Sequence, residues 1–186
     1  MKRAVDIVGS LAGLILLSPL LLAIGLSVRA ESPGPALHWS RRVGRYNAIF
    51  AMPKFRTMRN GAPDVATHLL GDPDAWITPL GRVLRRTSLD ELPQLWSVLK
   101  GDMSLVGPRP ALFNQDDLVA LRTEAGVETL RPGLTGWAQI NGRDELPIPE
   151  KVKLDREYLE RRSFAFDLRI MVGTALAALT GRGVSH

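Results

Sequence analysis

The stretch IVGSLAGLILLSPLLLAIGLSV, residues 7–28, contains no charged side chain and determines how the rest of the chain is interpreted. A run of about 20 apolar residues is normally long enough to cross a bilayer as one helix. The pair Ser18-Pro19 lies in the middle of this run. Because proline removes a backbone donor and kinks a helix, and serine can bond to the carbonyls that are freed, we expect the helix to break there.

Basic residues lie on both sides of this segment. Lys2 and Arg3 precede it, and Arg29 follows it directly. Since positive charge stays on the cytoplasmic side of a membrane, two basic flanks favour a re-entrant helix that enters, breaks and returns to the same face. A single kinked span is the second interpretation. A secretory signal cleaved after Ala30 is the third, although Asp6 beside the apolar run argues against export.

Composition limits the chemistry of the remaining residues. The chain has 186 residues, enough for one domain with a core, and a formal net charge of +5. Most of its 24 basic residues are arginines, which favours a phosphate-rich partner such as a nucleotide or a lipid headgroup. The absence of cysteine excludes disulfides, thiol catalysis and thiolate metal sites.

The segments after the apolar run predict a mostly helical α+β domain that rests on the membrane. We divide the chain into a re-entrant membrane helix, residues 1–30, and a cytoplasmic catalytic domain, residues 31–186, which form one structural unit. A small strand pair is expected within 36–58, and helices at 81–86, 92–100, 111–128 and 148–162. The apolar segment 164–180 is interrupted by Asp167 and Arg169, so it suits an amphipathic helix lying in the interface.

The segment RVLRRTSLDELPQLWSVLKGDMSLVGPRP, residues 82–110, allows two interpretations. Ser88 and Glu91 match a capping box, which would make Asp90 and Glu91 ordinary acidic residues of a first helical turn. Alternatively, one carboxylate of this pair attacks a phosphorus atom and the other holds Mg²⁺, while nearby arginines neutralise phosphate oxygens. The residues alone leave both interpretations open.

Several segments together closely resemble the bacterial sugar transferase family of monotopic phosphoglycosyl transferases. They are Ser18-Pro19, KFRTM at 54–58, the block 84–110, RPGLTGWAQINGR at 131–143 and SFAFDLRI at 163–170. The resemblance implies a re-entrant helix broken at Ser18-Pro19 on the cytoplasmic face of the bacterial inner membrane. It also implies transfer of a sugar 1-phosphate from a UDP-sugar to undecaprenyl phosphate through an aspartyl-phosphosugar, with release of UMP.

The resemblance assigns roles to individual residues. Asp90 is the implied nucleophile, and Glu91 is the implied ligand of the cofactor Mg²⁺. Pro108, Arg109 and Pro110 form the family's proline-arginine-proline motif near the substrate phosphates. The further implied contacts to the nucleotide sugar or the polyprenyl phosphate are Lys54, Arg56, Arg86, Arg131 and Arg143. Ser97 and Pro53 depart from the usual family pattern, without touching the catalytic pair.

The implied reaction is the first membrane step of glycoconjugate or exopolysaccharide biosynthesis. Two other functions are compatible with the residues. A non-catalytic membrane scaffold would use its arginines to bind anions or lipids, with steep salt dependence and no turnover. A glycosyltransferase that moves only the sugar would release UDP instead of UMP. The expected partners are a UDP-sugar, undecaprenyl phosphate and the lipid bilayer, and no nucleic acid is expected.

Overall fold

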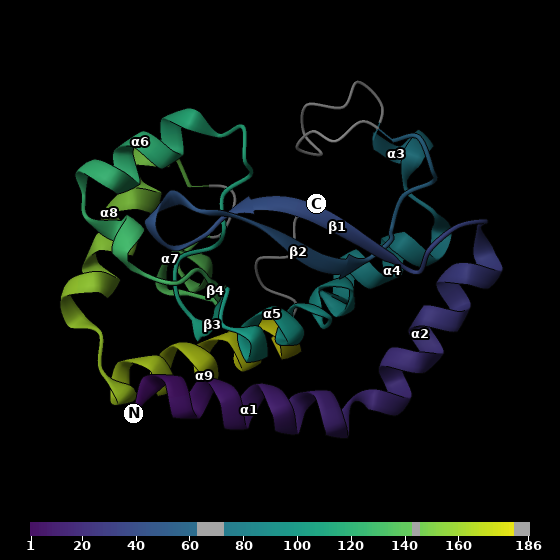
Figure 1. The fold of residues 1–186 in the computed structure, drawn as a ribbon, viewed down its shortest axis with the longest axis horizontal. Helices are drawn as coiled ribbons and strands as arrows, with labels where there is room; N and C mark the ends of the chain where they lie inside the picture. The colour runs from purple at the N-terminus through teal and green to yellow at the C-terminus, as the bar shows by residue number, and fades with distance from the viewer. Residues whose placement is uncertain (63–72, 143–145, 181–186) are drawn as a thin grey trace.

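The computed structural model describes residues 1–62, 73–142 and 146–180. Within these ranges the chain is mostly helical and carries two small two-stranded sheets, so the predicted α+β class is confirmed (Figure 1). The helices are α1 (Lys2–Leu16), α2 (Ser18–Glu31), α3 (Pro73–Trp76), α4 (Pro79–Thr87), α5 (Gln94–Lys100), α6 (Asp116–Glu124), α7 (Trp137–Ile140), α8 (Ile148–Arg161) and α9 (Phe164–Thr180). The strands are β1 (Leu37–Val43), β2 (Ile49–Phe55), β3 (Ser104–Val106) and β4 (Gly133–Thr135).

The apolar N-terminal segment forms two helices that meet at a sharp bend (Figure 1). α1 and α2 are bent by 62° at the predicted break. Pro19 lies in the first turn of α2, where its missing N–H is tolerated, and the Ser18 hydroxyl donates to the Ile15 carbonyl at 2.8 Å. Among the described residues no single helix has both the length and the apolar composition of a membrane span, whereas the bent pair together has them.

Polar contacts attach α1 to the rest of the domain. The Asp6 carboxylate is buried and accepts hydrogen bonds from the Ser104 hydroxyl and the Leu105 N–H, both at 2.9 Å. Arg3 donates to two carbonyl groups in the last turn of α5, where a positive charge is favoured by the helix dipole. The orientation of α1 is therefore fixed by β3 and α5.

The predicted strand pair is confirmed as the antiparallel hairpin β1–β2, with Leu37 opposite Phe55 at its open end. Because side chains alternate along a strand, the register places Arg42, Met52 and Lys54 on one face. Met52 is buried in a core cluster with residues of α5 and the loop after it. Arg42 and Lys54 therefore extend along the inner side of the hairpin, next to the helix that follows the acidic pair.

A second sheet, which the sequence did not predict, consists of the parallel strands β3 and β4. Two glycines allow their backbones to approach closely. A Cβ atom added at Gly133 would lie 2.1 Å from the Gly107 nitrogen, and one added at Gly107 would lie 2.4 Å from the Arg131 carbonyl oxygen. Any side chain at these positions would push the backbones apart, and the segment 108–110 directly follows this junction.

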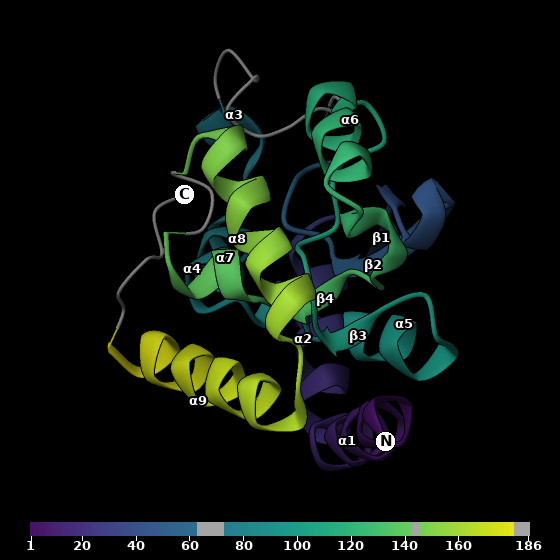
Figure 2. The ribbon, with the colours of Figure 1, turned by 90° about the vertical axis from the view of Figure 1, so that its left-hand side faces the viewer.

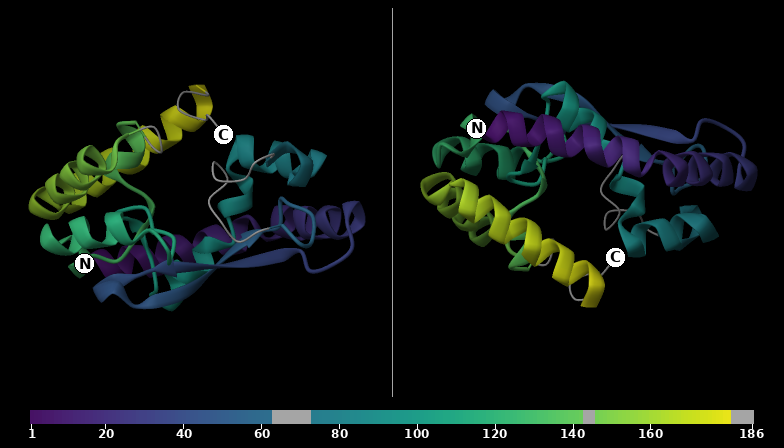
Figure 3. Two further views of the ribbon diagram at one scale, coloured as in Figure 1. Left: turned by 90° about the horizontal axis from the view of Figure 1, so that it is seen from above. Right: turned by 90° about the horizontal axis from the view of Figure 1, so that it is seen from below.

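The C-terminal helices complete the molecule. α8 and α9 bury Tyr158, Phe166 and Ile170 against Val106 of β3. Lys2 at the start of α1 forms a 2.7 Å ion pair with Asp167 of α9. Figures 2 and 3 show α1 and α9 next to each other near the N-terminus and diverging from there.

Local predictions differ in their outcome. The helices expected at 148–162 and 164–180 are present with nearly these bounds, but the one expected at 111–128 is reduced to α6. The capping box at Ser88 is wrong. Ser88 has a left-handed φ of 56°, ends α4, and makes no side-chain cap. The helix that follows starts only at Gln94, since Pro93 cannot donate within a helix.

The contacts of Asp6 predict a stability effect. In Asp6→Ala the buried Ser104 hydroxyl and Leu105 N–H lose their acceptor, and the free energy of unfolding should fall by about 1–3 kcal/mol. Chemical unfolding of the detergent-extracted protein measures this. The control is Asp102→Ala, whose partner Lys100 is mostly exposed, so that the expected loss is only about 0–1 kcal/mol. Equal losses in the two variants would contradict the proposed anchoring of α1.

Candidate active site

The acidic pair Asp90 and Glu91, referred to below as the dyad, lies in the turn between α4 and α5. The turn is a short 3₁₀ helix, Leu89–Glu91, entered through the left-handed backbone of Ser88. The left-handed conformation of Ser88 ends α4 just before the dyad. Asp90 is only 8% exposed, and the Glu91 side chain is 23% exposed. The structure therefore places two adjacent carboxylates in a partly buried position.

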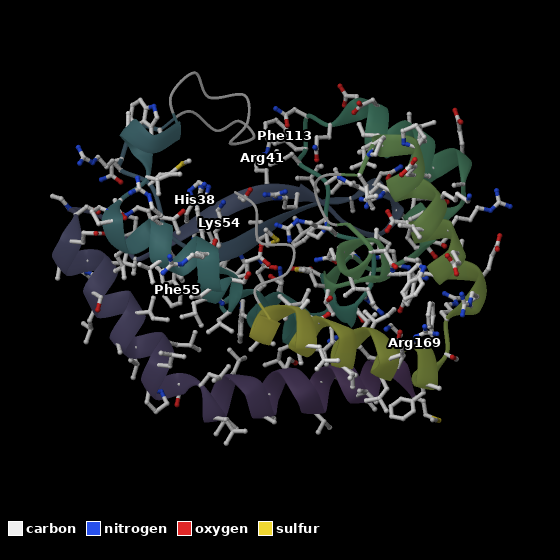
Figure 4. All side chains as sticks on the ribbon, turned by 180° about the vertical axis from the view of Figure 1, so that it is seen from behind. His38, Arg41, Lys54, Phe55, Phe113 and Arg169 are labelled. Carbon is white, nitrogen blue, oxygen red and sulfur yellow. The ribbon has the colours of Figure 1, made fainter. Side chains whose placement is uncertain are left out.

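Cationic side chains from three separate elements act on the dyad. Arg109, in the segment after β3, forms an ion pair with Glu91 in which Nη2 lies 2.8 Å from Oε1. Lys54 on β2 and Arg85 on α4 are close enough to lower the pKa of Asp90 through their charges. These residues, together with Arg42 on β1, form what we term the cationic cluster. Lys54 is labelled in Figure 4.

The two carboxyl groups have opposite pKa shifts. Burial and the neighbouring Glu91 charge raise the pKa of Asp90 to about 6, against the opposing charges of Lys54, Arg85 and Arg109. Burial would also raise the pKa of Glu91, but the charge and hydrogen bond of Arg109 outweigh it, and this pKa is lowered. Glu91 is thus the more acidic of the two carboxyl groups, while Asp90 is the more basic and, with a pKa of about 6, is still largely ionised at neutral pH.

Lys54 is perturbed in the opposite sense. Burial, followed by the positive charges of Arg42 and Arg85, lowers the pKa of its ammonium group to about 8, although the dyad charges act against this shift. Its charge therefore disappears in mildly alkaline solution, which is uncommon for lysine. Burial also lowers the pKa of the Arg85 guanidinium, against the opposing effect of the Asp90 charge.

The backbone of residues 108–110 is held by hydrogen bonds to three successive carbonyl groups. The Pro108 carbonyl accepts from the Gly133 N–H at 2.8 Å, the Arg109 carbonyl from Arg122 at 2.8 Å, and the Pro110 carbonyl from Arg42 at 3.2 Å. The prolines further limit the backbone. The Arg109 side chain therefore starts from a rigid position when it reaches Glu91.

The residue that binds the Arg109 carbonyl is itself part of a buried ion pair. Arg122 of α6 donates through Nε and Nη2 to Oδ2 of Asp155 on α8, at 2.9 and 2.6 Å. Asp155 is 1% exposed and Arg122 is 8% exposed. Two helices outside the dyad's immediate surroundings thus determine the position of the proline-arginine-proline segment.

The structure separates the two arginines at the end of α4. Arg85 donates from Nε to the Thr57 hydroxyl at 2.9 Å and lies on the side of the helix that acts on Asp90. Arg86, the residue named from the sequence, lies on the exposed side. Its role as a substrate contact stays a prediction, and Arg85 joins the site as a residue that sequence reasoning did not select.

Three other sequence-predicted contacts lie apart from the dyad or outside the described residues. Arg56 is 7% exposed and donates to the carbonyls of Ser32 and Pro33, both at 2.7 Å, at the end of α2. Arg131 donates from Nε to the Gly101 carbonyl at 2.8 Å. Arg143 is outside the described residues. The geometry gives Arg56 and Arg131 structural contacts, so their substrate roles remain predictions.

Comparison with known proteins identifies the family of this chain. The model of the family "Bacterial sugar transferase" matches residues 1–181. The chain belongs to the bacterial sugar transferase family. The resemblance noted in the sequence is thereby confirmed.

Individual relatives of this bacterial sugar transferase are similar over almost the whole chain. It is 42% identical to UDP-glucose:undecaprenyl-phosphate glucose-1-phosphate transferase of Caulobacter vibrioides, covering 96% of this chain and 70% of that protein. It is 40% identical to exopolysaccharide production protein PSS of Rhizobium leguminosarum, covering 98% of each. A UDP-glucose:undecaprenyl-phosphate glucose-1-phosphate transferase of Escherichia coli is 39% identical, with 98% of this chain and 41% of that protein covered.

The dyad of this sugar transferase suits a hard cation that also binds substrate phosphates. Within the described ranges no group of three or more histidine, cysteine or acidic side chains could hold a metal ion by itself. Mg²⁺ usually takes only one or two protein carboxylates and completes its coordination with water and substrate oxygens. The two adjacent carboxyl groups of Asp90 and Glu91 fit this pattern, with Glu91 the more acidic of the two.

Proposed function

We propose that this chain transfers a sugar 1-phosphate from a UDP-sugar to undecaprenyl phosphate at the cytoplasmic face of the bacterial inner membrane. The enzyme class, a sugar-1-phosphate transferase, follows from the family and from the names of its relatives. The observation that carries the proposal is a buried Asp90 with a raised pKa, surrounded by Lys54, Arg85 and Arg109. A carboxylate surrounded by cationic side chains is suited to attack an anionic phosphate, because the cations offset the repulsion between the two negative charges. The reaction would be the first membrane step of glycoconjugate or exopolysaccharide synthesis.

The reaction proceeds in two displacements at one phosphorus atom. A carboxylate oxygen of Asp90 attacks the β-phosphorus of the UDP-sugar, and the bond from that phosphorus to the bridging oxygen breaks. The bridging oxygen leaves with its electron pair as part of UMP, so that an aspartyl-phosphosugar remains. A phosphate oxygen of undecaprenyl phosphate then attacks the same phosphorus, and the Asp90 carboxylate is the leaving group. The lipid product carries a diphosphate linked to the sugar.

The cationic cluster makes this anion-on-anion attack feasible. Lys54, Arg85 and Arg109 bring positive charge to the place where the phosphate oxygens must lie. Fixed charges of this kind stabilise a transition state more than solvent does, because they need no reorganisation during the reaction. Burial raises the basicity of Asp90, which strengthens it as a nucleophile, while a pKa of about 6 leaves it ionised at neutral pH.

Mg²⁺ is the proposed cofactor, and Glu91 would hold it. When bound, the ion neutralises charge on the diphosphate of the donor and orients it. Arg109 keeps Glu91 ionised and fixes its orientation through their 2.8 Å contact. Asp90, whose pKa is higher, is left for the covalent step.

We also propose that α1 and α2 form a re-entrant helix pair, residues 1–30, which belongs to one structural unit with the catalytic domain at 31–186. The bend at Ser18-Pro19 and the apolar residues exposed on both helices support this topology. Contacts from Asp6 and Arg3 then hold the membrane segment at a fixed angle to β3 and α5. A dyad at the membrane surface can meet a soluble donor and a lipid acceptor in turn.

The nucleotide released by the reaction tests the proposed function. We expect UMP when the purified protein receives Mg²⁺, undecaprenyl phosphate and a panel of UDP-sugars, and no UMP from Asp90→Asn. Release is measured by chromatography of the nucleotides. UDP as the product would mean transfer of the sugar alone. Lipid binding with steep salt dependence and no turnover, in folded protein, would instead indicate a non-catalytic scaffold.

The pKa shifts predict a bell-shaped dependence of kcat/KM on pH. Activity should rise through about pH 6 as Asp90 ionises, and fall through about pH 8 as Lys54 loses its charge. Lys54→Met should lower kcat/KM by about 100-fold, remove the alkaline limb, and move the acidic limb to higher pH. The acidic limb moves because the Lys54 charge no longer lowers the pKa of Asp90. An unchanged acidic limb in this variant would contradict the assignment.

The cysteine-free sequence allows a direct topology test. Single cysteines placed at the exposed positions Ala4 and Ala30 should both react with an impermeant maleimide in inverted membrane vesicles, and neither should react in intact spheroplasts. Pro19→Ala restores a backbone donor at the bend and should shift part of the population toward a straight span. Labelling of one end from outside in the otherwise native protein would mean a spanning helix and reject the re-entrant topology.

A further inference from the structure

A second cluster of basic side chains lies where α8 ends and α9 begins, outside the proposed site. A shallow groove, wide open to solvent, lies there. Its lining residues are Arg161, Ser163, Ala165, Phe166 and Arg169. Two guanidinium groups thus share this groove with one aromatic ring and a hydroxyl group, and none of them belongs to the dyad or the cationic cluster.

Aromatic rings hold both guanidinium groups in place. The Arg161 Cζ lies 4.7 Å from the ring centroid of Phe166, and the Arg169 Cζ lies 5.7 Å from that of Trp137. The two rings pack against each other with centroids 5.0 Å apart. A guanidinium stacked on a ring keeps its N–H edge available for oxygen ligands, so the pair is suited to a phosphate group.

The surrounding carboxylates leave excess positive charge in the groove. Glu157 forms an ion pair with Arg161 and accepts a 2.8 Å hydrogen bond from Trp137 Nε1. Within the described residues, Arg169 has no carboxylate in ion-pair contact. One acidic group therefore faces two arginines, and an additional anion would restore balance.

The groove borders the apolar surface of α9. Phe164, Leu168, Val172 and Leu176 are all about half exposed and follow one another at intervals of four residues, so they form one stripe along the helix. On one flank of this stripe Asp167 binds Lys2 of α1. The helical spacing puts Arg169 on the opposite flank of the stripe from Asp167.

We propose that this groove binds the phosphodiester headgroup of an anionic phospholipid, with Arg161 and Arg169 as the contacts to its phosphate oxygens. The proposal rests on the membrane setting of the proposed function. With the stripe of α9 facing acyl chains, the two arginines and Trp137 lie at headgroup depth, where arginine and tryptophan are favoured. Guanidinium groups bind phosphate through paired N–H donors, and each basic residue at the membrane surface contributes about 1 kcal/mol.

The test measures stabilisation of the full-length protein by lipid. Protein in detergent receives increasing phosphatidylglycerol or, separately, phosphatidylcholine, and the thermal unfolding midpoint is recorded. Phosphatidylglycerol should raise the midpoint, and phosphatidylcholine should have little effect. The double variant Arg161→Gln/Arg169→Gln should need about thirtyfold more phosphatidylglycerol for the same shift, which is the loss of two contacts of about 1 kcal/mol each.

The matched control is Arg156→Gln, which removes the same charge from an exposed position on α8. This control should respond to phosphatidylglycerol as the unaltered protein does. If it loses as much of the response as the double variant, the effect is non-specific charge attraction, and the proposal is wrong. In a separate titration, glycerol 3-phosphate replaces the lipid. If it stabilises the protein as well as the lipid does, the ligand is a soluble phosphate, and the lipid assignment is wrong.

UMP release by the double variant separates this inference from the proposed function. The arginines of the groove lie outside the dyad and the cationic cluster, so turnover in detergent with added undecaprenyl phosphate should be retained. Retained turnover together with a lost lipid response supports the groove alone. If the double variant responds to phosphatidylglycerol as the parent protein does, the groove proposal is wrong, whether or not UMP is released. If the parent protein releases no UMP, only the proposed function is rejected.

Discussion

The arrangement of the molecule depends on keeping two adjacent carboxylates partly buried. Asp90 and Glu91 repel each other, and each loses hydration when the chain folds, so they require positive charge at short range. Each source of this charge lies on a different element: the β1–β2 hairpin, α4 and the segment after β3. The dyad can form only when these elements have assembled. We propose that the same charges also bind the phosphate groups of the substrate.

Contacts outside the dyad hold the segment 108–110, which carries Arg109, in a defined position. Backbone contact at Gly107 and Gly133 brings β3 beside β4, and the three carbonyls of residues 108–110 are all hydrogen bonded. The buried pair of Arg122 and Asp155 links this segment to α6 and α8. A rigid backbone lowers the entropy cost of holding Arg109 against Glu91. The position of Arg109 beside the dyad therefore depends on α6, α8 and the junction of β3 and β4.

Local chemistry made part of this structure predictable from sequence. The bend at Ser18-Pro19 follows from a missing proline N–H and a serine that can bond to the freed carbonyl, and neither depends on distant residues. The hairpin and the last two helices have patterns long enough to recognise. Strands β3 and β4 have three residues each, too few for any periodicity to appear. Their pairing depends on two glycines that are far apart in the sequence.

The remaining differences arise from tertiary packing. Arg86 was named from the sequence and Arg85 was not, because the rotation of α4 depends on a tertiary contact at Gly81. A Cβ added there would lie 2.1 Å from the Thr57 carbonyl oxygen. Arg56 resembled a phosphate contact, but its guanidinium is bonded to the end of α2. The identity of Asp90 and Glu91 as the central pair came from the family resemblance. Their different pKa values come from neighbours that only the fold brings together.

The most direct test of the central claim is to identify the atom that carries the phosphosugar between the two displacements. Protein incubated with its UDP-sugar and Mg²⁺ but without acceptor is quenched, digested and examined by mass spectrometry. We predict that the peptide containing Asp90 gains the mass of one sugar phosphate, and that undecaprenyl phosphate removes this mass. An adduct on a different residue, or none in protein that turns over when the acceptor is present, would contradict Asp90 as the nucleophile.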